Sequence, residues 1–98
     1  MKVSILKTKS KLCSISIYFK ANQELNFKTN MFVIKEINGC LLIRESTILD
    51  NKVYKLSKSN QLNYHSVNAE NFIGEQELLT EDGYFIIEPI KYHKVLWR

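Results

Sequence analysis

Lysines dominate the start of this 98-residue sequence and carry its clearest potential for chemistry. The chain has a net charge of +4, and residues 1–35 hold one acid, Glu24, against seven lysines: Lys2, Lys7, Lys9, Lys11, Lys20, Lys28 and Lys35. A lysine ammonium group is a flexible point charge that suits phosphate groups. Such a basic segment is a candidate surface for polyanions. It also fits a solvated face that keeps the protein in solution, and charge alone does not decide between the two.

The second half of the chain has the opposite charge. Residues 70–88 contain no base and six acids: Glu70, Glu75, Glu77, Glu81, Asp82 and Glu88. Three cations follow them, Lys91, Lys94 and Arg98. This asymmetry predicts two surfaces of different character on one molecule.

The residues that usually perform catalysis or bind metals are sparse. His65 and His93 are the only histidines, and Cys13 and Cys40 each lie inside an apolar run without a second cysteine at ligand spacing. There is no glycine-rich phosphate loop and no nucleophile-elbow motif. We therefore expect neither an enzyme nor a metal site, and no cofactor.

Length and hydropathy limit the architecture. A chain of 98 residues with 45% apolar and 24% charged residues is typical of one globular domain. Its longest apolar runs are far shorter than a membrane span. We expect a single domain over residues 1–98 that is cytoplasmic and makes no membrane contact.

Alternation of polar and apolar residues predicts strands and hairpins. Residues 2–7 and 12–19 are expected to pair as a hairpin. Residues 31–45 form a second predicted hairpin around Asn38-Gly39, because a type I′ turn needs positive φ at both central positions. Between the two hairpins, residues 19–27 have apolar residues near helical spacing and predict one or two turns of helix.

The second half repeats this order. Residues 53–67 alternate like the first hairpin, Asn68 is a candidate helix N-cap with Gly74 as the stop, and residues 75–89 form a hairpin around Asp82-Gly83. Four apolar matches at a spacing of fifty residues join the halves: Val3 with Val53, Leu6 with Leu56, Leu12 with Leu62, and Ile17 with Val67. Gly39 and Gly83 are forty-four apart. The pattern predicts a duplicated unit.

Three stretches resemble the AbrB/MazE-type (SpoVT-AbrB) swapped-hairpin DNA-binding domain. "SIYFKANQELNF" (residues 16–27) follows the family's strand and short helix, and "MFVIKEINGCLLIRE" (residues 31–45) follows its last hairpin. "EDGYFIIEP" (residues 81–89) is similar to the family's final strand and the proline after it. The resemblance covers residues 3–45 well and residues 53–91 more loosely.

This chain departs from the family pattern at three places. Tyr18 stands where the family has proline, Asn26 replaces the usual glycine, and Thr29-Asn30 replaces a Gly-Asp step. Asparagine also tolerates left-handed backbone, so the second departure is compatible with the fold.

The resemblance implies a mainly β fold: a small closed β-barrel of interleaved hairpins with one or two short helices and an internal pseudo-two-fold. Residues 1–46 would be the first AbrB-like repeat, residues 53–91 a second, degenerate repeat, and residues 92–98 a C-terminal tail. Two copies in one chain would form a monomeric pseudo-dimer, because pairing the halves removes exposed sheet edges. The alternative is a homodimer through the first half, with the second half as a separate partner-binding region.

The resemblance also implies a function, that of a small DNA-binding transcriptional regulator or antitoxin-like protein. Positions that match the family's DNA-contacting hairpin loops are Lys7, Lys9, Lys11, Lys55 and Lys58. The lysines would bind phosphates of duplex DNA, and Asn60 with Gln61 would contact base edges.

The competing hypothesis is a protein-binding module, either a toxin-neutralising antitoxin or a phage-encoded inhibitor. It would use the acidic surface of residues 70–88 and the aromatic and basic tail, with Tyr92, Leu96, Trp97 and Arg98 as anchors, since aromatic residues and arginine are enriched in interface hot spots. A tail that packs back on the core is the simpler interpretation of those four residues.

Overall fold

The protein is mainly β. The computed structural model describes residues 2–9, 12–19, 27–47 and 49–90, and the predicted helix around residues 20–26 lies outside this part of the chain. The described residues form nine strands and one short 3₁₀ helix, which are β1 (Lys2–Lys7), β2 (Ser14–Phe19), β3 (Met31–Ile37), β4 (Cys40–Glu45), β5 (Tyr54–Lys55), β6 (Gln61–His65), η1 (Ala69–Phe72), β7 (Gly74–Glu77), β8 (Leu79–Glu81) and β9 (Tyr84–Ile87).

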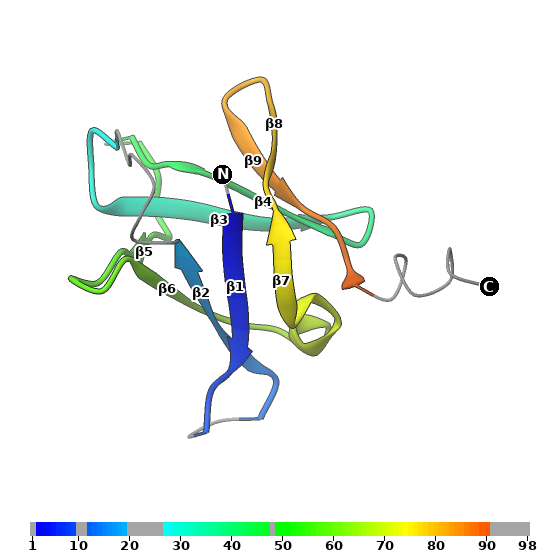
Figure 1. Ribbon diagram of the computed structural model, residues 1–98. Helices are drawn as coiled ribbons and strands as arrows, with labels where there is room; N and C mark the ends of the chain where they lie inside the picture. Colours follow the sequence, from blue (N-terminus) through cyan, green and yellow to red (C-terminus); the bar gives the residue numbers. More distant parts are fainter. Residues whose placement is uncertain (1, 10–11, 20–26, 48, 91–98) are drawn as a thin grey trace.

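These strands form two antiparallel sheets. The first has the order β6-β2-β1-β7 and the second β5-β3-β4-β9-β8. Figure 1 shows the strands of one sheet running across those of the other. A mainly β fold was predicted, and the two-sheet arrangement gives each sheet an inner face that packs on the other.

Alternation along the strands fills the space between the sheets. Val3 and Ile5 of β1, Ile15 and Ile17 of β2, and Ile43 of β4 have no exposed surface. Ser14 and Ser16 alternate with the two β2 isoleucines on the opposite face. The period of two in the sequence therefore sets which side chains enter the core.

The turns of both tight hairpins are confirmed, although the second hairpin pairs only β8 with β9, while β7 pairs with β1. Asn38 and Gly39 have φ values of 53° and 78°, and Asp82 and Gly83 have 51° and 82°. Positive φ at both central residues is what a type I′ turn requires. The hairpins β1–β2 and β3–β4 also pair as expected.

The two halves of the chain are interleaved. Strands of residues 1–46 pair with strands of residues 53–91 in four ladders, β1–β7, β2–β6, β3–β5 and β4–β9. Each half thus completes a sheet that the other half begins. Their cores are one core, since buried residues from all of these ladders form a single cluster.

The predicted hairpin over residues 53–67 is wrong. A turn joins β5 and β6, with Ser57 donating its backbone N–H to Gln61, but β5 pairs with β3 and β6 pairs with β2. Asn60 has a φ of 58° and its carbonyl accepts the N–H of Phe19, which directs β6 onto β2. The turn therefore sends its two strands into different sheets.

Two finer expectations also fail. Asn68 makes no side-chain cap to η1 and donates instead to Glu36 at 3.4 Å. The fifty-residue matches do not share environments, because Ile17 is fully buried and Val67 is 85% exposed. The apolar core residues of β2 are odd-numbered and those of β6 even-numbered, so an even offset places the wrong face inward. The forty-four-residue offset of the tight hairpins does match buried Ile43 with buried Ile87.

Candidate nucleic-acid interface

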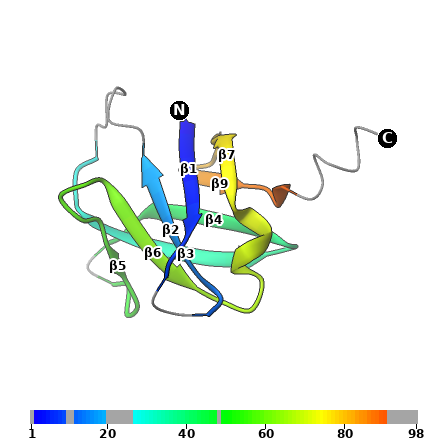
Figure 2. The ribbon, with the colours of Figure 1, turned by 60° about the horizontal axis from the view of Figure 1, so that its bottom comes forward.

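The strand order separates charge between two sides of the molecule. β5 and β6 are edge strands of the two sheets, and β8 and β7 are the opposite edges. In Figure 2, as in Figure 1, β5 and β6 lie on one side and β7 on the other. We call the first the β5/β6 side and the second the β7/β8 side.

The β5/β6 side carries cations that have no counterion among the described residues. Lys52, Lys55 and Lys58 belong to this side, Lys35 lies next to it on β3, and all four are exposed. No described carboxylate forms an ion pair with any of the four. A cluster of unpaired lysines repels itself and attracts an anionic partner.

One surface hollow brings two of the predicted lysines together. It has a volume of about 570 Å³ and is lined by Asn30, Lys55, Leu56, Ser57 and Lys58. The backbone N–H of Leu56 donates to the carbonyl of Asn30 at 2.7 Å, so the two walls are tied to each other. We call this the lysine hollow.

A second hollow lies along β6. It has a volume of about 290 Å³ and is lined by Ser14, Lys52, Tyr54, Asn63, Tyr64 and His65. The Lys52 ammonium lies 5.8 Å from the centre of the Tyr54 ring, a cation–π distance. Cation, aromatic ring and imidazole thus stand at the same edge as the lysine hollow.

The floor of the β6 face is a small amide network. Asn63 Oδ1 accepts from the Ser16 hydroxyl at 2.8 Å and from Gln61 Nε2 at 2.7 Å. Because both bonds go to the oxygen, the Asn63 amide presents its NH₂ group as a donor. Gln61 also donates to Ser16 at 3.0 Å, so its amide is engaged within the face.

The lysines predicted near the start of the chain do not join the lysine hollow. Lys7 ends β1, and its Nζ lies 3.6 Å from the Glu70 carboxylate. Lys9 is exposed in the loop before β2, and Lys11 lies outside the described residues. This loop is at the opposite end of the β2–β6 ladder from the turn that holds Lys58, because Ser14 pairs with His65 and Tyr18 with Gln61. The structure therefore does not gather all of the predicted lysines.

Asn60 has a structural place in the turn. Its backbone N–H donates to Ser57 at 3.0 Å, and its φ of 58° suits asparagine. It adjoins the lysine hollow in sequence without lining it.

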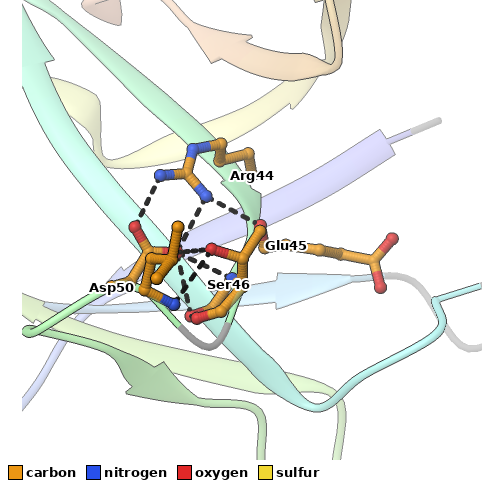
Figure 3. A network of polar contacts seen from close by, with 6 residues as sticks. Arg44, Glu45, Ser46 and Asp50 are labelled. Carbon is orange, nitrogen blue, oxygen red and sulfur yellow. Dashed lines mark hydrogen bonds and ion pairs between the residues drawn. The ribbon is translucent and has the colours of Figure 1, made fainter.

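The nearest acids on this side are held by partners. Asp50 accepts both Nη atoms of Arg44, at 3.0 and 2.7 Å, as Figure 3 shows. Arg44 also donates to the Glu45 carbonyl at 3.0 Å. The hydrogen bonds from Arg44, with others from Thr47 and Ser46, hold the pKa of Asp50 well below its usual range. This carboxylate is neutralised by its own arginine and forms no ion pair with the four lysines.

Glu36 joins the sheets. It accepts the Tyr64 hydroxyl at 2.7 Å, across from β3 to β6. Partial burial opposes ionisation of Glu36, but hydrogen bonds from Ser66, Tyr64 and Asn68 together lower its pKa. Burial and this carboxylate raise the pKa of Tyr64. The pair is a fixed structural contact and presents no free acid to a ligand.

The β7/β8 side is acidic and partly apolar. Leu42, Ile86 and Leu79 stand side by side across three neighbouring strands on the outer face of the second sheet. Leu79 is 49% exposed, and Glu77, Glu81 and Asp82 are exposed around it. An apolar row with a charged rim is typical of a protein-binding surface.

The remaining expectations concern the C-terminal anchor residues, metal binding and membrane spans. Tyr92, Leu96, Trp97 and Arg98 lie outside the described residues. Within the part of the chain that the structure describes, no three His, Cys, Asp or Glu side chains form a group able to hold a metal ion. None of the described helices is long and apolar enough to cross a membrane.

The sequence alone missed Lys52, Lys35 and the aromatic partner Tyr54. Tyr54 belongs to β5 and the two lysines lie near it, and β5 is a strand of two residues that the pattern placed in a different hairpin. A signal was present, since residues 52–58 hold three lysines and no acid.

Comparison with known proteins adds no name to this geometry: no family model, curated protein or solved structure matches the chain.

Proposed function

We propose that this protein is a small DNA-binding protein, of the regulator or antitoxin type, that holds duplex DNA along its β5/β6 side. Lys52, Lys55 and Lys58 bind backbone phosphates. Lys9 contacts the same duplex from the loop at the far end of the β2–β6 ladder. The ladder from Ser14 to Tyr18 spans roughly 13 Å, and the loops extend beyond both of its ends.

The observation that carries this proposal is the cluster of unpaired lysines at one edge of the molecule. Ion-paired cations such as Lys7 must lose a protein partner before they bind phosphate, whereas Lys55 and Lys58 have no such described partner. Between the lysine sites lies a polar face with the Asn63 amide as a hydrogen-bond donor. At a DNA surface, lysines usually bind phosphates and side-chain amides usually contact base edges.

The proposal includes the AbrB-like ancestry and the repeat. In it, residues 1–46 and 53–91 are two swapped-hairpin units that build one small barrel-like core as a pseudo-dimer. The ladders support this, because β1 pairs with β7 of the other half and β5 pairs with β3 of the other half. β2–β6 and β4–β9 then lie on the pseudo-two-fold axis, each strand paired antiparallel with its counterpart.

A pseudo-dimer of this kind satisfies its sheets within one chain and is expected to be a monomer. Sedimentation equilibrium or light scattering measures this directly. A mass near the 11.5 kDa of the chain is the expected result. A stable dimer would instead favour assembly through the first half of two chains.

The DNA-binding proposal is tested by the salt dependence of affinity. About four lysine–phosphate contacts predict a slope of log K against log salt of roughly −3 to −4 for duplex DNA. Fluorescence anisotropy with a labelled duplex at several chloride concentrations measures it. No binding at the lowest salt, by a protein that is folded there, would contradict the proposal.

A second candidate function is the protein-binding module, favoured by the apolar row and acidic rim of the β7/β8 side. A basic partner would dock there, with the C-terminal Tyr92, Leu96, Trp97 and Arg98 as further anchors. Charge reversal at Glu81 and Asp82 would then weaken the protein complex and leave DNA affinity unchanged or higher.

A further inference from the structure

The lysine hollow differs from an ordinary lysine-bearing surface because its walls are fixed by backbone contacts. Lys55 is the ladder partner of Met31, and Leu56 is bonded to Asn30. Ser57 donates its N–H to Gln61, which closes the turn on the other side. The backbone of the residues that line the hollow is therefore held in place before any ligand arrives, which lowers the ordering cost of binding.

Ser57 is oriented by its neighbours. Its hydroxyl oxygen accepts the backbone N–H groups of Ser59 and Gln61, both at 3.2 Å. A hydroxyl oxygen has two lone pairs and one hydrogen. With both lone pairs used, the hydrogen is left as a donor, and no described residue accepts it. The Asn30 side-chain amide likewise has no described partner, although its carbonyl is bonded to Leu56.

The donors in this hollow lack a matching acceptor. The residues that line this space of about 570 Å³ carry two lysine ammonium groups, one hydroxyl hydrogen and one side-chain amide, and the described ones include no carboxylate. A tetrahedral oxyanion supplies several strong acceptors and negative charge in one compact group. A phosphate group supplies the acceptors and the negative charge that this set of donors requires.

We propose that the hollow lined by Asn30, Lys55, Ser57 and Lys58 is a binding site for a single phosphate group. The two lysines supply charge, and the serine and asparagine supply directed hydrogen bonds. The inference rests on the proposed function only for the source of the phosphate, which is then a DNA backbone diester. A free phosphate monoester has the same recognition chemistry and is the other source.

The test is an NMR titration of the whole ¹⁵N-labelled protein at constant ionic strength. One arm uses inorganic phosphate and the other the dinucleoside monophosphate of thymidine, a diester. We expect saturable shifts at Asn30, Ser57 and Lys58 in at least one arm. Tighter binding of the diester assigns the site to nucleic acid, and tighter binding of inorganic phosphate assigns it to a free monoester.

Two double variants make the titration specific. Lys55→Gln/Lys58→Gln should weaken binding about tenfold or more, because it removes both ammonium groups that form charged hydrogen bonds with the phosphate. Lys2→Gln/Lys7→Gln removes the same charge elsewhere and should leave the affinity unchanged. Shifts spread over all lysines without saturation, or equal losses in both variants, would overturn the site.

The outcome is separable from that of the proposed function. Phosphate binding without duplex binding would retain the hollow and reject the DNA-binding proposal. Duplex binding without a response of Asn30, Ser57 and Lys58 to either phosphate probe would retain the DNA-binding proposal and reject the phosphate site.

Discussion

Asp50 shows how a single residue fixes the connection between the halves. It accepts five hydrogen bonds from three residues, Arg44, Ser46 and Thr47. Its side chain is 17% exposed and that of Arg44 is 24% exposed. A bidentate arginine–carboxylate pair has a defined geometry that lysine would not reproduce. The network thus fixes the conformation of the segment that leads from β4 toward β5 and the lysine hollow.

The lowered pKa of Asp50 predicts a pH dependence of stability. The unfolded chain has the ordinary value, 3.8, and the folded value is lower, so the folded state favours the ionised form. This contribution is fully present above the unfolded pKa and is lost as the pH falls through the folded pKa. Asp50→Asn should be less stable than the natural chain at pH 7, and the difference should shrink in acid.

Urea denaturation at a series of pH values measures this difference. Asp82→Asn is the matched control, since Asp82 is exposed in a hairpin turn that asparagine also fits. The control should follow the natural chain at every pH. An Asp50→Asn curve parallel to that of the natural chain down to strongly acid pH would contradict the role given to the network.

At the scale of elements, the sequence predicted the tight turns but not which strands pair with each other. The Asn38-Gly39 and Asp82-Gly83 turns follow from two residues each, because left-handed backbone is chemically specific. The separation of β5 from β6 depends on the bond between Asn60 and Phe19, forty-one positions apart in the chain. β7 has the sequence GEQE, whose lack of apolar alternation gave no sign that it completes the first sheet beside β1.

The start of β7 offers a test of its packing. Gly74 has a φ of 139°, and a Cβ there would lie 3.3 Å from Cδ1 and Cγ1 of Ile90. Gly83 also has positive φ, but a Cβ there meets nothing within 4 Å. Gly74→Ala should therefore cost about 2–3 kcal/mol, and Gly83→Ala only about 1 kcal/mol of backbone strain.

The free energy of unfolding of both variants, from urea denaturation with an unchanged slope, checks this difference. Gly83→Ala is the reference for a positive-φ glycine in the milder left-handed region, without a contact to its Cβ. Equal losses in the two variants would mean that the chain around Ile90 is free to move away from β7.

At the scale of the whole molecule, charge is sorted by the sheet edges rather than by the order of the sequence. The front of the chain is basic, but β1 lies beside acidic β7, where Lys2 is the ladder partner of Glu77, and Lys7 contacts Glu70. Opposite charges on neighbouring strands attract each other. The described cations without a described carboxylate partner are those around β5, together with Lys9 and Lys28. The sequence indicated a basic surface, whereas its location depended on contacts more than sixty residues apart.

This sorting is the central claim, and the affinity of a labelled DNA duplex for the natural chain and three variants tests it most directly. The triple variant Lys52→Gln/Lys55→Gln/Lys58→Gln should bind more than about tenfold more weakly than the natural chain, with a salt slope smaller in magnitude by about 3. The corresponding triple arginine variant keeps the charge and should bind like the natural chain, as should Lys2→Gln. An unchanged affinity and slope in the triple glutamine variant, or an equal loss in Lys2→Gln, would contradict the account.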